Sequence, residues 1–320
     1  MDSITSWINS DFFSGLSKSI MQLNVYLLLF SFVAALLVLY NCRLFYELIC
    51  SVDCDEQQGA GDRLVDAPGF DYGVSNGPHT WQSADNNQSP INIETSDAVL
   101  HCFDNPLLWL GYDVMPSAIR LQNDGRTLKL HAAYPDEKPN IDGCDFLGSF
   151  SFHEISFRWS WYNETGSEHT VDNEHFPMEM QCLHTDATDH NHASSHGILI
   201  VSYMFSVSTE NPYLDVIIQH LVLVQSAGRQ VEIPPFPLRY LMPAFYTDFY
   251  SYHGSLTEPP CHRGAEWFIS PISLAISERQ LHEFRKLRTR SGTRISRNAR
   301  PVQPLCDRDV FFNRYESGRR

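Results

Sequence analysis

Short runs in which apolar and polar residues alternate recur from about residue 70 onward, and turn-forming residues close each of them. Residues 117–122 and 127–131 alternate in this way, and residues 197–205 form an almost continuous apolar run. A period of two residues is typical of a β-strand with one buried face, and a short apolar run fits a strand buried on both faces. The pattern therefore predicts one large domain dominated by β-strands.

Two local signals refine this prediction. Residues 123–125 (Asn-Asp-Gly) separate the first two runs and predict a hairpin turn, because Asp-Gly supplies the positive φ that such turns need. Residues 277–286 carry the clearest helical pattern, and Ser277 is placed to cap the first turn. We therefore expect many strands and few helices.

The segment 23–42 is a separate feature, with about 20 uncharged residues that match the span of a bilayer core. Tyr26 and Tyr40 lie near its ends, where interfacial aromatic residues are favoured. A cleaved signal peptide is the rival interpretation, but the run is longer than a typical signal core and no basic segment lies close to Met1. A buried core helix fits least, since no polar face is marked. We predict an uncleaved transmembrane helix.

The orientation of this helix is poorly determined by the flanking charges, because Lys18 precedes the span and Arg43 follows it. Asn163 begins an Asn-Glu-Thr acceptor pattern for N-glycosylation, which favours a luminal or extracellular domain. We therefore expect a single-pass membrane protein whose folded domain lies on that side of the membrane.

The net charge of the chain is -15, and this argues against a nucleic-acid partner, since duplex binding needs a basic face. The basic run at residues 285–300 is the local exception. It is interpreted either as a solvated loop or as a site for an acidic partner.

Several motifs lie in a fixed order along the domain. They are residues 72–81 (Tyr-Gly-Val-Ser-Asn-Gly-Pro-His-Thr-Trp), 88–93 (Gln-Ser-Pro-Ile-Asn-Ile), 166–171 (Gly-Ser-Glu-His-Thr-Val), 252–261 (Tyr-His-Gly-Ser-Leu-Thr-Glu-Pro-Pro-Cys), Trp267 and 298–305 (Asn-Ala-Arg-Pro-Val-Gln-Pro-Leu). Their order and spacing resemble the α-carbonic anhydrases over about residues 70–306. The resemblance implies an α+β domain with the α-carbonic anhydrase fold: a large, mostly antiparallel twisted sheet with short peripheral helices.

Together with the apolar segment, the resemblance gives a domain plan. We expect a tail at 1–22, a transmembrane helix at 23–42, a juxtamembrane linker at 43–69, a carbonic anhydrase-like domain at 70–309 and a C-terminal tail at 310–320.

In this family, a His-x-His pair on one strand and a third histidine on the next strand hold zinc, with a fourth position open for water. The matching positions here are Ser156, Arg158 and Gln181. Bound zinc lowers the pKa of water to roughly 7, and these three side chains cannot do so. The resemblance therefore implies that the zinc cofactor has been lost.

Other functional positions of the family are retained or altered. Glu168 and Thr257 match the pair that orients the zinc-bound hydroxide, and Glu179 matches the carboxylate behind the third ligand, now without an imidazole to support. Arg126 replaces a histidine proton shuttle and cannot relay protons near neutral pH. The residues that match the apolar wall of the site are Leu183, Ile200, Leu256 and Trp267.

Arg158 would bring a positive charge to the place of the metal, and we expect it to pair with Glu168, Glu179 or Glu154. Glu258 adds a carboxylate at the mouth of the site. The stretch from His184 to His196 is rich in His and Asp, and is interpreted either as a relocated metal site or, preferably, as a polar surface loop.

Cys261 also departs from the family pattern. Extracellular relatives commonly pair this cysteine with one just before the Gln-Ser-Pro motif, but residues 81–87 contain none. Either Cys261 has another partner or the domain is reduced.

The leading hypothesis is a membrane-anchored carbonic anhydrase-related protein without catalytic activity, which acts as a binding module for an unidentified protein partner. The first alternative is an enzyme after all, with residual esterase or hydratase activity through Glu168, Thr257 and Glu258 or with a relocated metal. The second is a domain that serves only as a spacer.

Overall fold

The computed structural model describes residues 69–81, 86–144, 148–187 and 197–316. The predicted transmembrane helix at 23–42 and almost all of the predicted linker at 43–69 lie outside these residues. None of the helices in the described residues has the length and hydrophobicity that a membrane span requires.

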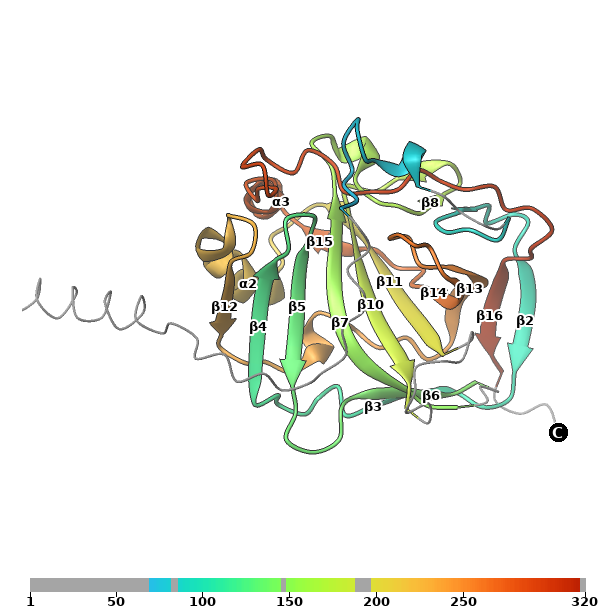
Figure 1. Cartoon of the computed structure of the whole chain (residues 1–320). Helices are drawn as coiled ribbons and strands as arrows, with labels where there is room; N and C mark the ends of the chain where they lie inside the picture. Colours follow the sequence, from blue (N-terminus) through green and yellow to red (C-terminus); the bar gives the residue numbers. More distant parts are fainter. Residues whose placement is uncertain (1–68, 82–85, 145–147, 188–196, 317–320) are drawn as a thin grey trace, which may run out of the picture. The chain divides into compact units, whose positions relative to one another are not determined.

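A large mixed sheet forms the body of the domain (Figure 1). Along the sheet its strands are β12 (Gln230–Ile233), β4 (Ala118–Asn123), β5 (Leu128–Ala133), β7 (Phe150–Trp159), β10 (Met178–Asp186), β11 (Ile198–Val207), β14 (Arg263–Ile269), β13 (Asp248–Ser255), β16 (Phe311–Tyr315) and β2 (Val99–Phe103). Most neighbours are antiparallel, as expected, but β11 is parallel to β14 and β16 is parallel to β2. These parallel pairs make the sheet mixed.

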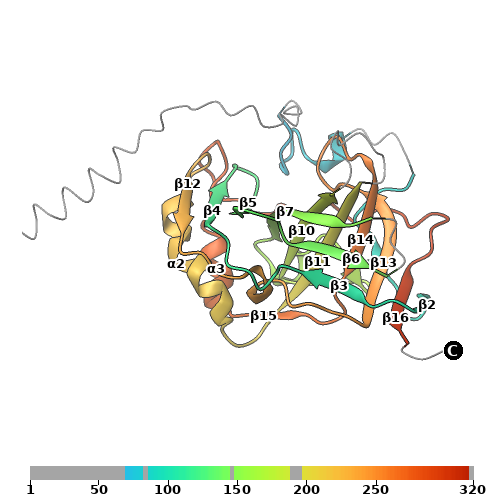
Figure 2. The ribbon, with the colours of Figure 1, turned by 90° about the horizontal axis from the view of Figure 1, so that it is seen from below.

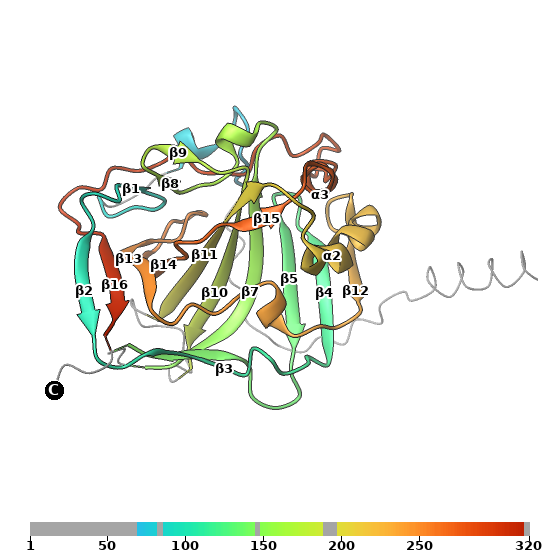
Figure 3. The ribbon, with the colours of Figure 1, turned by 180° about the vertical axis from the view of Figure 1, so that it is seen from behind.

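Smaller elements surround this sheet. The remaining strands are β15 (Leu274–Ile276), which pairs with β11, β6 (Asn140–Gly143) and β3 (Leu107–Leu110), which extend from β7, and the separate small sheet of β1 (Asn92–Ile93), β8 (Thr170–Val171) and β9 (Glu174–His175). The helices are α2 (Asp215–His220), α3 (Glu278–Phe284), η1 (Pro78–Thr80), η2 (Asn163–Thr165), η3 (Pro212–Leu214), η4 (Leu221–Val224) and η5 (Leu238–Tyr240). α2 and α3 lie together near β12 and β4 (Figures 2 and 3).

Both local predictions are confirmed. β4 and β5 form an antiparallel hairpin, and Gly125 in its turn has a φ of 91°. Ser277 caps α3 by accepting a hydrogen bond from the backbone N–H of Gln280, whose side chain accepts one from the backbone N–H of Ser277 in return. The helix ends at Phe284, two residues earlier than the pattern indicated.

The alternation along the strands divides the interior into two apolar clusters. On β7, Ile155, Phe157 and Trp159 are buried in the larger cluster, which also includes residues of α2 and α3. Ser156 and Arg158 alternate with them and so point to the opposite face of the sheet. The smaller cluster, built around Trp267 of β14, lies apart from the first.

The expected tail at 310–320 needs a correction, because Phe311–Tyr315 forms β16 between β13 and β2. Asn313 is buried and donates from Nδ2 to the hydroxyl of Ser251 at 2.8 Å, and the Phe312 and Tyr250 rings lie 5.0 Å apart. Strand β16 pairs only with segments that are distant in sequence. Its five residues also show no regular alternation of buried and exposed side chains that would reveal the strand.

Candidate functional site

β7 and β10 bring the three altered positions together. The two strands are antiparallel, with Gln181 opposite Ser156 and Glu179 opposite Arg158. Because alternate residues of a strand share a face, all four side chains lie on the face away from the larger apolar cluster. The sequence-based placement of Ser156, Arg158 and Gln181 on adjoining strands is therefore confirmed.

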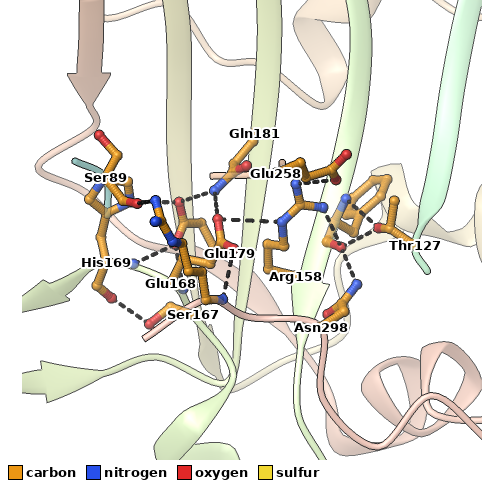
Figure 4. Close-up of polar contacts among 12 residues, drawn as sticks. Ser89, Thr127, Arg158, Ser167, Glu168, His169, Glu179, Gln181, Glu258 and Asn298 are labelled. Carbon is orange, nitrogen blue, oxygen red and sulfur yellow. Dashed lines mark hydrogen bonds and ion pairs between the residues drawn. The ribbon is translucent and has the colours of Figure 1, made fainter. Parts of the chain in front are cut away.

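Arg158 forms a buried ion-pair network at this site (Figure 4). Its side chain is 3% exposed; Nη2 lies 2.8 Å from Oε1 of Glu258 and Nε lies 3.4 Å from Oε2 of Glu168. The expected partner Glu168 is confirmed. Glu154 is not a partner, because its carboxylate accepts a hydrogen bond from Lys129 at 2.8 Å instead.

Glu258 is the partner that the sequence did not assign to Arg158. It follows Thr257 in the turn after β13, 100 positions along the chain from the arginine. Burial acts to raise the pKa of the Glu258 carboxyl, but the positive charge of Arg158, with Lys129 and Arg126 further away, outweighs burial and lowers it. Glu258 is therefore held ionised as a counter-charge for Arg158.

Glu168 is buried and its two oxygens are occupied by other groups. Oε2 accepts a hydrogen bond from Nε2 of Gln181 at 2.7 Å, and Oε1 accepts one from the backbone N–H of Arg300 at 2.9 Å. Thr257 is also buried. Among the described residues, no hydrogen bond joins its hydroxyl to Glu168.

Glu179 is the most heavily hydrogen-bonded carboxylate of the site. Oε1 accepts from Nδ1 of His169, Nε2 of Gln181 and the hydroxyl of Ser202, at 2.8 to 2.9 Å. Oε2 accepts from the backbone N–H groups of Glu168 and His169. At the third-ligand position the amide of Gln181 takes the place of an imidazole, and Glu179 also holds the ring of His169, a contact that the sequence did not indicate.

Complete burial acts against the ionised form of Glu179, but His169 and the other donors outweigh it and hold the pKa at about 2. His169 is itself buried, and its Nε2 lies 2.7 Å from the hydroxyl of Tyr252. The carboxylate is therefore an internal anchor that ties β10 to β11 and to the segment before β8.

The donor set at the altered positions does not fit zinc. Ser156 and Gln181 are poor zinc ligands, and Arg158 brings a permanent positive charge that is already paired with two carboxylates. In the parts of the chain that the structure describes, no three His, Cys, Asp or Glu side chains are arranged to hold a metal ion.

Among the described residues, Arg126 forms no ion pair with the carboxylates of this network, although its charge helps to lower the pKa of Glu258. Its guanidinium lies 3.9 Å from the centre of the Phe70 ring, and Nε donates to the Phe70 carbonyl at 3.0 Å. The residue lines a pocket of about 450 Å³ together with Tyr72 and residues of the segment 289–297. The position expected for a proton shuttle is thus occupied by a cation bound to an aromatic ring.

The four residues of the expected apolar wall belong to one cluster. Ile200 lies opposite Leu183 across the β10–β11 pair and opposite Trp267 across the β11–β14 pair. Leu256 is partly buried and packs against the same cluster. The structure therefore brings these side chains together beside the altered positions.

His184 belongs to the hydrophobic interior and not to a metal site. It alternates with Leu183 along β10 and so shares the face of Met180 and Cys182, and its Nε2 lies 2.7 Å from the buried hydroxyl of Tyr112. Burial lowers the pKa of His184 to about 4. The rest of the predicted His-rich stretch, from residue 188 to His196, lies outside the described residues.

This depressed pKa predicts a measurable pH dependence of stability. Since the folded form holds His184 neutral, its contribution is full above pH 6.5 and is lost as the pH falls from about 6.5 towards about 4. His184→Gln, which keeps an acceptor for Tyr112, should reduce the loss of unfolding free energy between pH 7 and pH 4.5 by about 2–3 kcal/mol. Urea unfolding at both pH values measures this change in pH dependence.

The control is His262→Gln, at an exposed position, and its pH dependence should match that of the native protein. An unchanged pH dependence in His184→Gln would show that this histidine is not responsible.

Asn163 has contacts at both polar atoms of its amide. Nδ2 donates to Glu278 at 2.7 Å, and Oδ1 accepts from Arg285 at 2.6 Å. A glycan on Nδ2 would alter the first contact. Cys261 is buried and forms no disulfide with any cysteine that the structure describes.

The sequence of the domain matches a known protein family. Residues 76–314 match the sequence profile of the eukaryotic-type carbonic anhydrase family. The chain belongs to this family. The sheet and the convergence of β7 and β10 agree with that membership.

Individual members of the carbonic anhydrase family resemble the chain to similar degrees. It is 32% identical to the human carbonic anhydrase-related protein over 243 residues, which cover 70% of this chain and 82% of the relative. It is 31% identical to putative carbonic anhydrase 5 of Caenorhabditis elegans over 258 residues, covering 76% of this chain and 81% of the relative. It is 30% identical to human carbonic anhydrase 7 over 256 residues, covering 76% of this chain and 96% of the relative. These identities alone do not divide enzymes from related proteins.

Proposed function

We propose that this protein is a carbonic anhydrase-related binding module that holds no catalytic zinc and does not hydrate carbon dioxide. The observation that carries the proposal is the buried ion-pair network of Arg158 with Glu168 and Glu258. A metal cation at this place would meet the guanidinium charge and would compete with it for the carboxylates. The arginine thus supplies the positive charge that these carboxylates would otherwise lack.

The proposal also explains why the remaining carboxylates are kept. Glu168 and Glu179 accept hydrogen bonds from Gln181 and from backbone N–H groups, and these bonds hold the strands together without any metal. We further propose that residues 23–42 anchor the chain in a membrane, with the domain on the luminal or extracellular side and a protein partner on its surface. The apolar length of the segment and the sequon at Asn163 support this part.

Restoration of the histidines tests the proposal. We expect Ser156→His/Arg158→His/Gln181→His to bind zinc, because β7 and β10 already place the three positions on one face. Zinc content and carbon dioxide hydration are measured for this variant and for the native chain. Native hydration at background level, with zinc only in the variant, supports the proposal.

A control variant with Ser156→Ala in place of Ser156→His completes the design, since it leaves one ligand position empty and should bind zinc more weakly. Carbon dioxide hydration by the native chain above background would contradict the proposal and favour residual enzyme activity.

A further inference from the structure

The basic run at residues 285–300 contributes one wall of the pocket next to Phe70. This pocket, of about 450 Å³, is called the arginine pocket here. Its polar lining consists mainly of Arg126, Arg290, Arg294, Arg297, Thr289, Ser291, Thr293 and Ser296. A volume of this size matches a small-molecule site. Such a concentration of arginines stands out in a chain whose net charge is -15.

Positive charge predominates in the pocket, because its lining includes four arginines and one carboxylate, that of Asp71. Among the described residues, no carboxylate forms an ion pair with Arg290, Arg294 or Arg297, and Arg290 and Arg294 are exposed. Asp71 also lines the pocket, and its Oδ1 accepts a hydrogen bond from the backbone N–H of Gly73 at 2.7 Å. The pocket therefore offers the guanidinium donors of Arg290 and Arg294 to an anion.

The walls of the pocket are held in place before any ligand binds. Arg288 and Arg294 form a β-bridge, and the side chain of Arg288 donates to the carbonyl of Gly292 at 2.8 Å. The hydroxyls of Thr289 and Thr293 lie 2.9 Å apart across the same turn. On the opposite wall, the contact with Phe70 fixes Arg126. A site that is already formed loses less conformational entropy on binding.

We propose that the arginine pocket binds a small soluble anion that carries at least two phosphoryl groups. Guanidinium groups form paired hydrogen bonds to phosphoryl oxygens, which a single charged amine cannot do, and the exposed Ser296 adds a hydroxyl to the lining. Several guanidinium groups favour more than one phosphoryl group. The pocket lining does not include Ser156, Arg158 or Gln181, so the proposal is independent of the fate of the zinc site.

Calorimetric titration of the full chain with inorganic tripolyphosphate, near physiological ionic strength, tests the proposal. We expect saturable binding with one ligand per chain. Arg290→Gln/Arg294→Gln should weaken it at least about tenfold, since two charge-assisted contacts are lost. The matched control is Arg120→Gln/Arg239→Gln, which removes the same charge from exposed positions outside the pocket and should change the dissociation constant less than about twofold.

Two further arms distinguish chemistry and source. Citrate should bind at least about tenfold more weakly than tripolyphosphate if phosphoryl recognition is specific. Absence of tripolyphosphate binding, equal weakening in both double variants, or binding only to vesicles that contain phosphatidic acid would each overturn the proposal. Zinc content measured on the same preparations reports on the proposed function separately.

Discussion

Glu179→Gln is expected to lower the free energy of unfolding by about 3–5 kcal/mol. The carboxylate accepts five hydrogen bonds, from His169, Gln181, Ser202 and two backbone N–H groups. A glutamine of the same shape offers one oxygen and turns an NH₂ group towards donors. Several buried donors would therefore lose their acceptor, and the His169 pair would be broken.

Urea unfolding at neutral pH measures this loss. Glu174→Gln is the matched control, because Glu174 is an exposed residue of the neighbouring strand β9, and it should change the unfolding free energy by less than about 0.5 kcal/mol. A loss of under about 1 kcal/mol in Glu179→Gln would show that this network is not a main support of the fold.

Arg158→Met has the second large expected effect, also about 3–5 kcal/mol of destabilisation. It removes the counter-charge of Glu168, which is fully buried, and of Glu258, which is 25% exposed. The remaining carboxylates would repel one another across a low-dielectric site. Combining it with Glu258→Met removes one of these charges and fills space, so the double variant should recover a large part of the loss.

A double-mutant cycle of native protein, Arg158→Met, Glu258→Met and the double variant gives the coupling between the two residues. We expect a favourable coupling of about 1–3 kcal/mol, whereas additive losses would show that the ion pair contributes no net stability. Arg239→Met is the control for loss of an exposed arginine and should have little effect.

Local sequence patterns predicted the local structure well. The Asp-Gly turn after Asn123 and the Ser277 cap were correct, because both depend on contacts within a few residues. The positions of Ser156, Arg158 and Gln181 on adjoining strands were also correct, but this expectation came from the resemblance to the family; alternation fixes only that Ser156 and Arg158 share a face.

The errors concern contacts between distant segments. The Glu258 partner of Arg158 and the pairing of strand β16 both depend on how segments far apart in the chain are brought together. The local pattern at residues 311–315 does not distinguish an unpaired C-terminal tail from a strand of the sheet. The arginine pocket shows the same limit, because its two walls come from segments near residues 70 and 290.

We propose that Arg158 supplies the positive charge that a metal ion would bring to this site. Elemental analysis of the purified full chain, after dialysis and without added chelator, tests this most directly. We expect no zinc above the level of a buffer blank in the native chain. Near-stoichiometric zinc that persists through dialysis, together with carbon dioxide hydration above background, would contradict it.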